Sequence, residues 1–261
     1  MATSRIEWTE RTWNPVTGCT KVSPGCKHGY AEQMAFRLQA MAAPGYARGF
    51  ALTLHTDRLG QPLGRKKPTF YFVCSMADLF HEAVPDAFID RVLATIHRTP
   101  RHTYQLLTKR AERLPDFFAN RPVPPNVWLG VTVEDRRHGL PRIDFLRQVP
   151  ARVRFLSVEP LREDLGPLDL DGIDWGESGL DARPMRPEWA LALSGHCRAT
   201  GVAFTFKQWG TWRSDGVRRD QKANGRLLAG QVWDERPELS GALLERDGAA
   251  ATVLLERRRW L

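Results

Sequence analysis

Two cysteines near the amino terminus are the side chains of this chain best suited to binding a metal. Cys19 and Cys26 are separated by six residues, and His28 and Gly29 follow them. Thiolates bind zinc and iron–sulfur clusters, and imidazole ligates some of the same centres. A zinc site would need His28 and one further ligand, for which a six-residue spacing is a weak signal. On its own, this pair leaves the kind of site open.

A second set of polar residues follows predicted strands, at the point where each strand ends. They are Ser75 and Asp78, then Lys109 and Arg110, Glu134, Glu159, and Lys207 with Gln208 and Trp209. In a parallel barrel the functional site is built at the carboxyl-terminal edge of the strands. We therefore expect these side chains to converge on one mouth, although each alone could be a cap or a loop charge.

The charged members of this set are the candidates for catalysis. Glu134 and Glu159 could accept ribose hydroxyls or transfer protons, since paired inward carboxylates are unusual as mere structure. Lys109 and Arg110 suit an anionic substrate. Lys207 could bind a base that stacks on a neighbouring ring, although Trp209 could equally pack beneath a carboxyl-terminal loop.

Three further residues are candidates for binding a cofactor. The oxygens of Ser75 and Asp78 could accept the ammonium or hydroxyl group of a cofactor, with a helix N-cap as the alternative. Glu177, in a Gly-Glu-Ser-Gly sequence, could contact the same cofactor. Ser75 and Asp78 belong to the set that we expect at the mouth.

Short apolar strands alternate with helices along the chain. Runs rich in aromatic and β-branched residues predict strands at 69–74, 103–108, 126–133, 153–158 and 202–206. Helical spacing and flanking prolines predict a helix at 86–99, and a second at 188–200 closes at Gly201. This rhythm predicts an α/β fold, as a complete or partial parallel (β/α) barrel.

The composition and charge of the chain narrow its possible partners and its cellular location. The chain has 261 residues and a net charge of +8, which favours contact with DNA, RNA or a phosphorylated substrate. The four cysteines are too few for a disulfide framework and no signal peptide is evident, so a cytoplasmic location is expected. No apolar run approaches the roughly 20 residues that cross a bilayer, so we expect no membrane span.

Motifs in order along nearly the whole chain resemble the phage Gp37/Gp68 family, a domain-of-unknown-function group. The matching segments are Trp13-Asn-Pro-Val-Thr-Gly-Cys19, Cys26, Ser75-Met-Ala-Asp-Leu-Phe-His81, Leu107-Thr-Lys-Arg110, Trp128-Leu-Gly-Val-Thr-Val-Glu134, Ser157-Val-Glu-Pro-Leu161, Gly176-Glu-Ser-Gly179, Ala182-Arg-Pro-Met185, Phe206-Lys-Gln-Trp-Gly210 and the tail segment 226–235.

That family is similar to the radical SAM enzymes, and the resemblance implies their barrel and cofactors. A 4Fe–4S cluster held by three cysteines leaves one iron open for S-adenosylmethionine, and an electron donor supplies the reducing electron. By this resemblance Cys19 and Cys26 match the first two ligands. Gly29 stands where the third cysteine belongs, and His28 is a weak substitute.

The resemblance divides the chain into a radical SAM-like barrel at residues 1–210 and a carboxyl-terminal extension at 211–261, packed on the barrel and ending in a basic tail. The chain is about four residues short of the family pattern before Gly176, which predicts a lost or re-registered strand.

Two functions follow. The first is a cluster-dependent, radical SAM-like enzyme acting on a nucleic acid or nucleotide, impaired or altered at Gly29. The second is a non-catalytic nucleic-acid-binding barrel descended from such an enzyme. The histidines lack metal-ligand spacing and no serine lies in a nucleophile elbow, which argues against a hydrolase.

Overall fold

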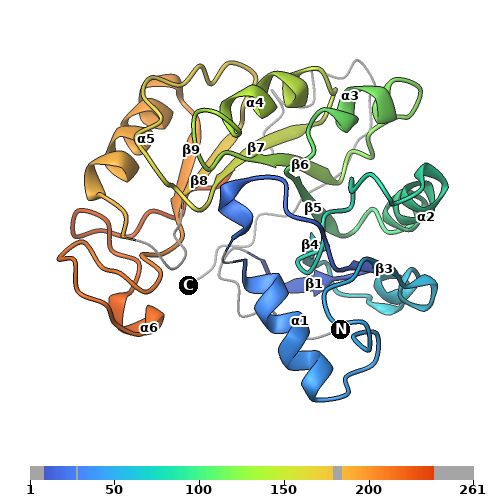
Figure 1. Ribbon diagram of the computed structural model, residues 1–261. Helices are drawn as coiled ribbons and strands as arrows, with labels where there is room; N and C mark the ends of the chain where they lie inside the picture. The colour runs from blue at the N-terminus through green and yellow to red at the C-terminus, as the bar shows by residue number, and fades with distance from the viewer. Residues whose placement is uncertain (1–8, 28, 179–183, 238–261) are drawn as a thin grey trace.

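The computed structural model describes residues 9–27, 29–178 and 184–237, and centres on one seven-stranded parallel sheet (Figure 1). The strands pair in chain order, each with the next. They are β1 (Arg11–Trp13), β4 (Phe70–Val73), β5 (Thr103–Thr108), β6 (Val127–Thr132), β7 (Val153–Val158), β8 (Trp175–Ser178) and β9 (Ala203–Phe206). Because β1 and β9 do not pair within the described residues, this α/β fold is a partial parallel barrel, as predicted.

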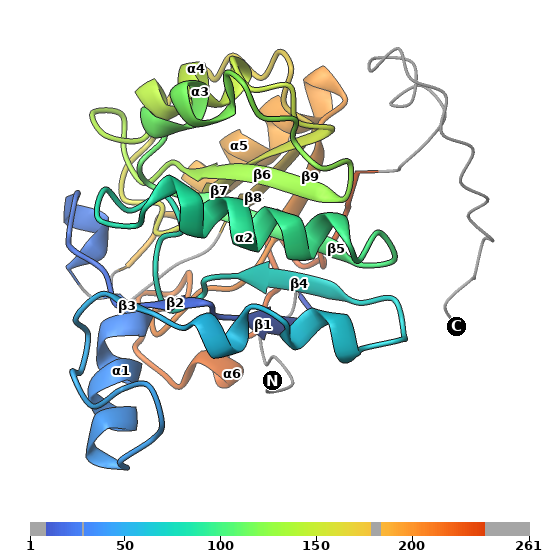
Figure 2. The same cartoon turned by 90° about the vertical axis from the view of Figure 1, so that its right-hand side faces the viewer.

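Helices cover the outer side of the curved sheet, as Figures 1 and 2 show. The α-helices are α1 (Tyr30–Ala40), α2 (Asp86–His97), α3 (Arg113–Phe118), α4 (Leu140–Arg147), α5 (Pro187–Thr200) and α6 (Gln221–Asn224). A small antiparallel pair, β2 (Val16–Thr17) with β3 (Thr53–Leu54), flanks β1, and the 3-10 helices are η1 (Pro24–Cys26), η2 (Thr56–Arg58) and η3 (Gln61–Gly64).

The predicted elements are present with small shifts at their ends. Strands at 103–108 and 153–158 match β5 and β7, and the predicted helix at 86–99 ends at His97. In α2 the residues that set the helical spacing, Phe88, Ile89, Val92 and Ile96 among them, are buried against the sheet. Apolar spacing on one face therefore places this helix correctly.

The two faces of the sheet carry different residues. The outer face contributes Tyr104 and other apolar side chains to the main core under the helices. The inner face carries a separate cluster in which Trp128, Phe155 and Trp175 pack on one another. Gly130 lies beside Phe155 on the neighbouring strand, and a Cβ at this position would collide with the phenylalanine ring. The inner face of the sheet thus carries a buried aromatic cluster.

The strand expected to be lost or re-registered before Gly176 is present. β8 begins at Trp175 and pairs with β7 on one side and β9 on the other, so the sheet is continuous there. The Trp-Gly-Glu-Ser sequence itself supplies the strand, and a missing insertion therefore does not remove it. The expectation of a lost strand is wrong.

The described part of the carboxyl-terminal extension contacts the last strand. Phe206 N–H donates to Trp233 O at 2.9 Å, and Glu235 N–H donates to Phe204 O at 3.2 Å. Residues 238–261, with the predicted basic tail, lie outside the described residues. In the part of the chain that the structure describes, no helix has the length and apolarity of a membrane span.

Candidate functional site

The mouth of the barrel is the carboxyl-terminal edge of the seven-stranded sheet, where the polar segments of the sequence follow their strands. Side-chain contacts link segments that follow neighbouring or more distant strands. Asp78, after β4, contacts Arg110, after β5, at 3.3 Å. Glu159, after β7, contacts Lys207, after β9, at 2.9 Å. The mouth holds three charge groups, described in turn.

The first charge group is centred on Arg110, which binds the cysteine loop (residues 18–27). Its Nη1 donates to Cys19 Sγ at 3.4 Å, and its Nη2 donates to Thr20 Oγ1 at 2.8 Å. Its Nε donates to Glu82 Oε2 at 2.7 Å. Burial raises the pKa of Cys19, Asp78 adds to this, and Arg110 opposes it only in part. The protonated thiol is therefore favoured.

Asp78 holds Arg110 and the start of the next loop in place. Its carboxylate accepts from Thr108 Oγ1 at 2.8 Å, from Lys109 N–H at 3.0 Å and from Phe80 N–H at 3.0 Å. The side chain is buried, and no helix begins here, so the N-cap alternative is wrong. Asp78 organises a turn and fixes the guanidinium beside Cys19.

The second charge group lies beneath the cysteine loop, around Glu134. Arg142 Nη1 donates to Glu134 Oε2 at 2.6 Å, and Lys109 Nζ lies 3.9 Å from the same oxygen. Glu134 has no exposed surface, and a Cβ on Gly25 would lie 3.1 Å from its Cγ. Burial raises the pKa of Glu134, but Lys109 and Arg142 outweigh it, and the pKa lies below its ordinary value. An ionised carboxylate therefore supports the loop.

The third charge group joins β7, β8 and the segment after β9. Lys207 Nζ lies 2.9 Å from Glu159 Oε2 and 2.7 Å from Glu177 Oε1, and donates to Ser157 Oγ at 3.3 Å. Burial lowers the pKa of Lys207, but the two carboxylates outweigh it and the pKa is raised. Burial raises the pKa of Glu177, and Lys207 offsets this only in part.

Access to solvent separates the two glutamates that Lys207 binds. The Glu159 side chain is 27% exposed, whereas Glu177 is fully buried. Glu159 also accepts a hydrogen bond from Gln208 Nε2 at 3.4 Å. In the alternation of β7, Phe155, Ser157 and Glu159 share the inner face of the sheet. Glu159 is therefore a solvent-accessible carboxylate at the mouth.

Two other predicted site residues bind the protein itself. Ser75 Oγ donates to Asn14 Oδ1 at 3.2 Å, joining the segments after β4 and β1. Trp209 is 2% exposed, packs on Phe206 and donates its Nε1 hydrogen to Leu227 O at 2.8 Å. The packing role for Trp209 beneath the extension agrees with this geometry, and its ring is not open for stacking.

The cysteines differ in burial. Cys19 and Cys26 are half-buried and carry free thiols, with Ser23 Oγ 3.7 Å from Cys26 Sγ. Cys74 and Cys197 are buried in the main core, and burial raises the pKa of Cys197 to about 12. The two core cysteines therefore serve packing.

The described residues do not fit a three-thiolate cluster. Cys19 and Cys26 supply two ligands, and Gly29, the N-cap residue of α1, supplies none. No group of three or more histidine, cysteine, aspartate or glutamate side chains in the described ranges is arranged to hold a metal ion. His28 lies outside the described residues.

Sequence reasoning missed Arg142 and Glu82. Arg142 lies on α4 and is 4% exposed, on the same buried side as Ile143 and Leu146. Its spacing of four residues from Leu146 was a signal that it points inward. Glu82 follows Asp78 by four residues in a loop, and no sequence pattern links it to Arg110.

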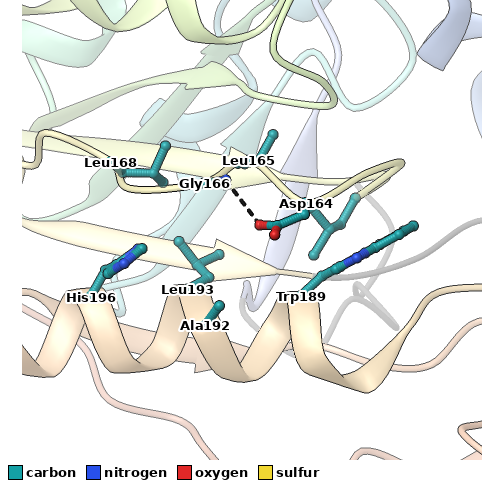
Figure 3. Close-up of a pocket in the computed structure, with 9 residues that line it drawn as sticks. Asp164, Leu165, Gly166, Leu168, Trp189, Ala192, Leu193 and His196 are labelled. Carbon is teal, nitrogen blue, oxygen red and sulfur yellow. Dashed lines mark hydrogen bonds between the residues drawn. The ribbon is translucent and has the colours of Figure 1, made fainter.

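A shallow pocket lies elsewhere, between α5 and the segment after β7 (Figure 3). Trp189, Leu193 and His196 of α5 line one side, and Asp164 on the other accepts the Gly166 N–H at 2.9 Å. Mainly apolar residues line it, and none of the predicted site residues does. The pocket is therefore separate from the mouth, where those residues lie.

Comparisons with known proteins give a family and a distant structural likeness. The profile of a family described as "Protein of unknown function (DUF5131)" matches residues 3–237. No curated protein matches the chain. Two solved structures are similar, spore photoproduct lyase complexed with dinucleoside spore photoproduct (13% identity) and a cysteine-to-serine mutant of the same enzyme (14%), both with a TM-score of 0.46. Each match covers 75% of this chain and 62% of the other chain.

Proposed function

Because this chain belongs to the DUF5131 family, whose function is unknown, we propose a role from the site itself: a barrel that binds a nucleoside or nucleotide at its mouth. The observation that carries this proposal is Glu159, a partly exposed carboxylate at the mouth that is held by a buried lysine. Carboxylates accept the hydroxyls of a ribose, and small-molecule sites use a few placed polar groups to fix the orientation of the ligand. S-adenosylmethionine, the cofactor implied by the phage Gp37/Gp68 and radical SAM resemblance, is a ligand of this class.

We further propose that the wider partner is nucleic acid, in keeping with the net charge of +8. In this proposal the chain binds without generating a radical. The cysteine loop then acts as a cover over Glu134, held by Arg110, and not as a cluster site. This is the non-catalytic alternative of the sequence analysis.

Ligand binding is tested by calorimetry with S-adenosylmethionine and, separately, with adenosine. Glu159→Gln should weaken binding at least about tenfold, the size expected for losing a charged hydrogen-bond acceptor. Glu188→Gln, an exposed carboxylate on α5, is the matched control and should bind as the parent does. Equal affinity of both variants would rule out Glu159 as the ligand contact.

Cluster content is tested by anaerobic reconstitution followed by iron and sulfide analysis. The parent protein should retain far less than the roughly four irons of a complete cluster. Gly29→Cys should raise occupancy sharply, because a Cβ there meets only Cys26 O, at 3.5 Å. Gly195→Cys on α5 adds a thiol where nothing lies within 4 Å and should not raise occupancy. Near-stoichiometric iron and sulfide in the parent would favour the enzyme instead.

A further inference from the structure

The amino-terminal edge of β4 and β5, opposite the mouth, carries a group of positive side chains. We call Arg65, Lys66, Lys67, Arg98 and Arg101 the basic edge. Arg65 to Lys67 precede β4, and Arg98 and Arg101 lie between α2 and β5. In Figure 2 these two connections lie at the right-hand side of the sheet, away from α1. All but Arg65 are exposed, and Arg65 is half-buried.

Backbone contacts fix the two segments of the basic edge against each other. Arg101 Nε donates to Arg65 O at 2.8 Å, and its Nη2 donates to Leu63 O at 3.1 Å. Thr103 N–H donates to Thr69 O at 3.1 Å where the strands begin. The sheet and these hydrogen bonds therefore keep the two charged segments next to each other.

Acidic side chains are scarce around the basic edge. Residues 58–77 and 91–111 contain no aspartate or glutamate. Within the described residues, none of the five cations of the basic edge forms an ion pair within 4.0 Å. Glu10 lies at the same edge, where its carboxylate accepts the Phe70 N–H at 3.0 Å. The positive charge is thus largely uncompensated.

The field of the basic edge reaches the residues packed beneath it. Burial lowers the pKa of His102 and the charges of Arg101 and Arg65 lower it further, while hydrogen bonds to the carbonyls of Pro62 and Arg65 offset part of this. The same two arginines oppose the burial that raises the pKa of Tyr71, and Glu10 opposes them weakly. Cations that act on two neighbouring groups form one local positive field.

We propose that the basic edge is a binding surface for the phosphodiester backbone of a nucleic acid. Lysine and arginine side chains neutralise phosphates, and closely spaced cations match the dense charge of a nucleic-acid strand. A membrane-binding surface would usually add exposed apolar anchors. None of the exposed large apolar side chains among the described residues belongs to this edge. The chemistry therefore favours phosphate contacts without insertion into a lipid surface.

This inference rests on the nucleic-acid part of the proposed function and assigns it a surface distinct from the mouth. It requires no cluster and no ligand at Glu159. If nucleoside binding at the mouth is lost, nucleic-acid binding at the basic edge should remain. If the cations of the basic edge are replaced, nucleoside binding should remain.

The test is fluorescence anisotropy with labelled duplex DNA, single-stranded DNA and RNA of equal length, over a salt series. The variant combines Lys66→Glu, Lys67→Glu and Arg98→Glu, whose side chains make no hydrogen bond or ion pair within the described residues. The control combines Arg48→Glu, Arg137→Glu and Lys222→Glu, three exposed cations elsewhere with the same total change in charge. Circular dichroism checks the fold of both.

The edge variant should bind at least about tenfold more weakly than the control, and the slope of log affinity against log salt should fall by about three. Equal binding by both variants, with the parent still binding, would overturn the assigned surface alone. No binding of any nucleic acid by the parent would overturn both the surface and the nucleic-acid part of the proposed function. Tighter binding to anionic vesicles or to an acidic peptide than to any nucleic acid would assign the edge to that other partner.

Discussion

The two ends of the sheet treat charge in opposite ways. At the mouth, Glu134 and Glu177 are fully buried, and each lies beside a cation. At the basic edge, exposed cations such as Lys66 and Lys67 have no ion-pair partner within the described residues. Buried charges cost several kcal/mol of desolvation each unless they are paired, whereas exposed charges stay in water. We conclude that buried ion pairs within the protein order the mouth, whereas the exposed cations of the basic edge are accessible to an external partner.

The largest effect that would test this contrast is expected at Lys207. Lys207→Met leaves Glu159 and Glu177 without their cation and should lower the free energy of unfolding by about 3–5 kcal/mol. Lys21→Met removes a lysine that is 50% exposed and pairs with Glu32, and should cost less than about 1 kcal/mol. Urea denaturation measures both. A loss below 1 kcal/mol at Lys207 would show that the mouth does not depend on internal pairing.

A somewhat smaller effect is expected at Glu134, with a defined dependence on pH. Glu134→Gln leaves Arg142 and Lys109 without a counter-charge and should cost about 2–3 kcal/mol at pH 7. Because the pKa of Glu134 is lowered in the folded protein, its contribution is present above the ordinary carboxyl pKa of 4.5 and is lost as pH falls through the folded value. The difference between parent and variant should therefore shrink below about pH 4.

Unfolding midpoints in urea between pH 7 and pH 3 provide the measurement. Asp144→Asn is the control, because this carboxylate is 75% exposed beside Arg147. If the difference in free energy of unfolding between the parent and Glu134→Gln stays constant from pH 7 to pH 3, the ionised form of Glu134 is not what supports the loop.

Glu177 should give the opposite dependence on pH. Its pKa is raised in the folded protein by burial, so its contribution to stability is full below pH 4.5 and declines as pH rises through the folded value. The stability of Glu177→Gln relative to the parent should therefore rise as the pH increases from 4 to 7. The same urea series checks it. A loss that grows with pH would place Glu177 with Glu134, as a carboxylate stabilised by its partner.

The sequence predicted the α/β fold and the gathering of polar residues at one edge of the sheet, because both depend on local patterns. Runs such as Thr103 to Thr108 alternate between the two faces, and polar residues follow directly after them. In contrast, β1 was not predicted, since a strand of three residues has too short a pattern to recognise. Long periodic segments are predictable, and short edge strands are set by their neighbours.

The partners within the mouth could not be predicted, for a different reason. Glu134 meets Arg142, eight residues later on a helix, and also Gly25, far away in the cysteine loop. Lys207, after β9, meets Glu177 on β8 and Glu159 after β7 only because these three strands lie side by side in the sheet. Such pairs depend on sheet register and loop path, and a single sequence records neither.

The smallest expected effect concerns the basic edge and completes the contrast with the mouth. Lys66→Gln, Lys67→Gln and Arg98→Gln together remove repulsion between like charges, and break no ion pair or hydrogen bond within the described residues. Stability should stay within about 0.5 kcal/mol of the parent, with any change a gain at low salt. In 1 M salt the Debye length falls to about 3 Å, so the gain should disappear. Unfolding midpoints at low and high salt decide this. A loss of more than 1 kcal/mol in the free energy of unfolding at both salt concentrations would mean that these cations support the fold. The basic edge and the mouth would then not differ in their contribution to stability.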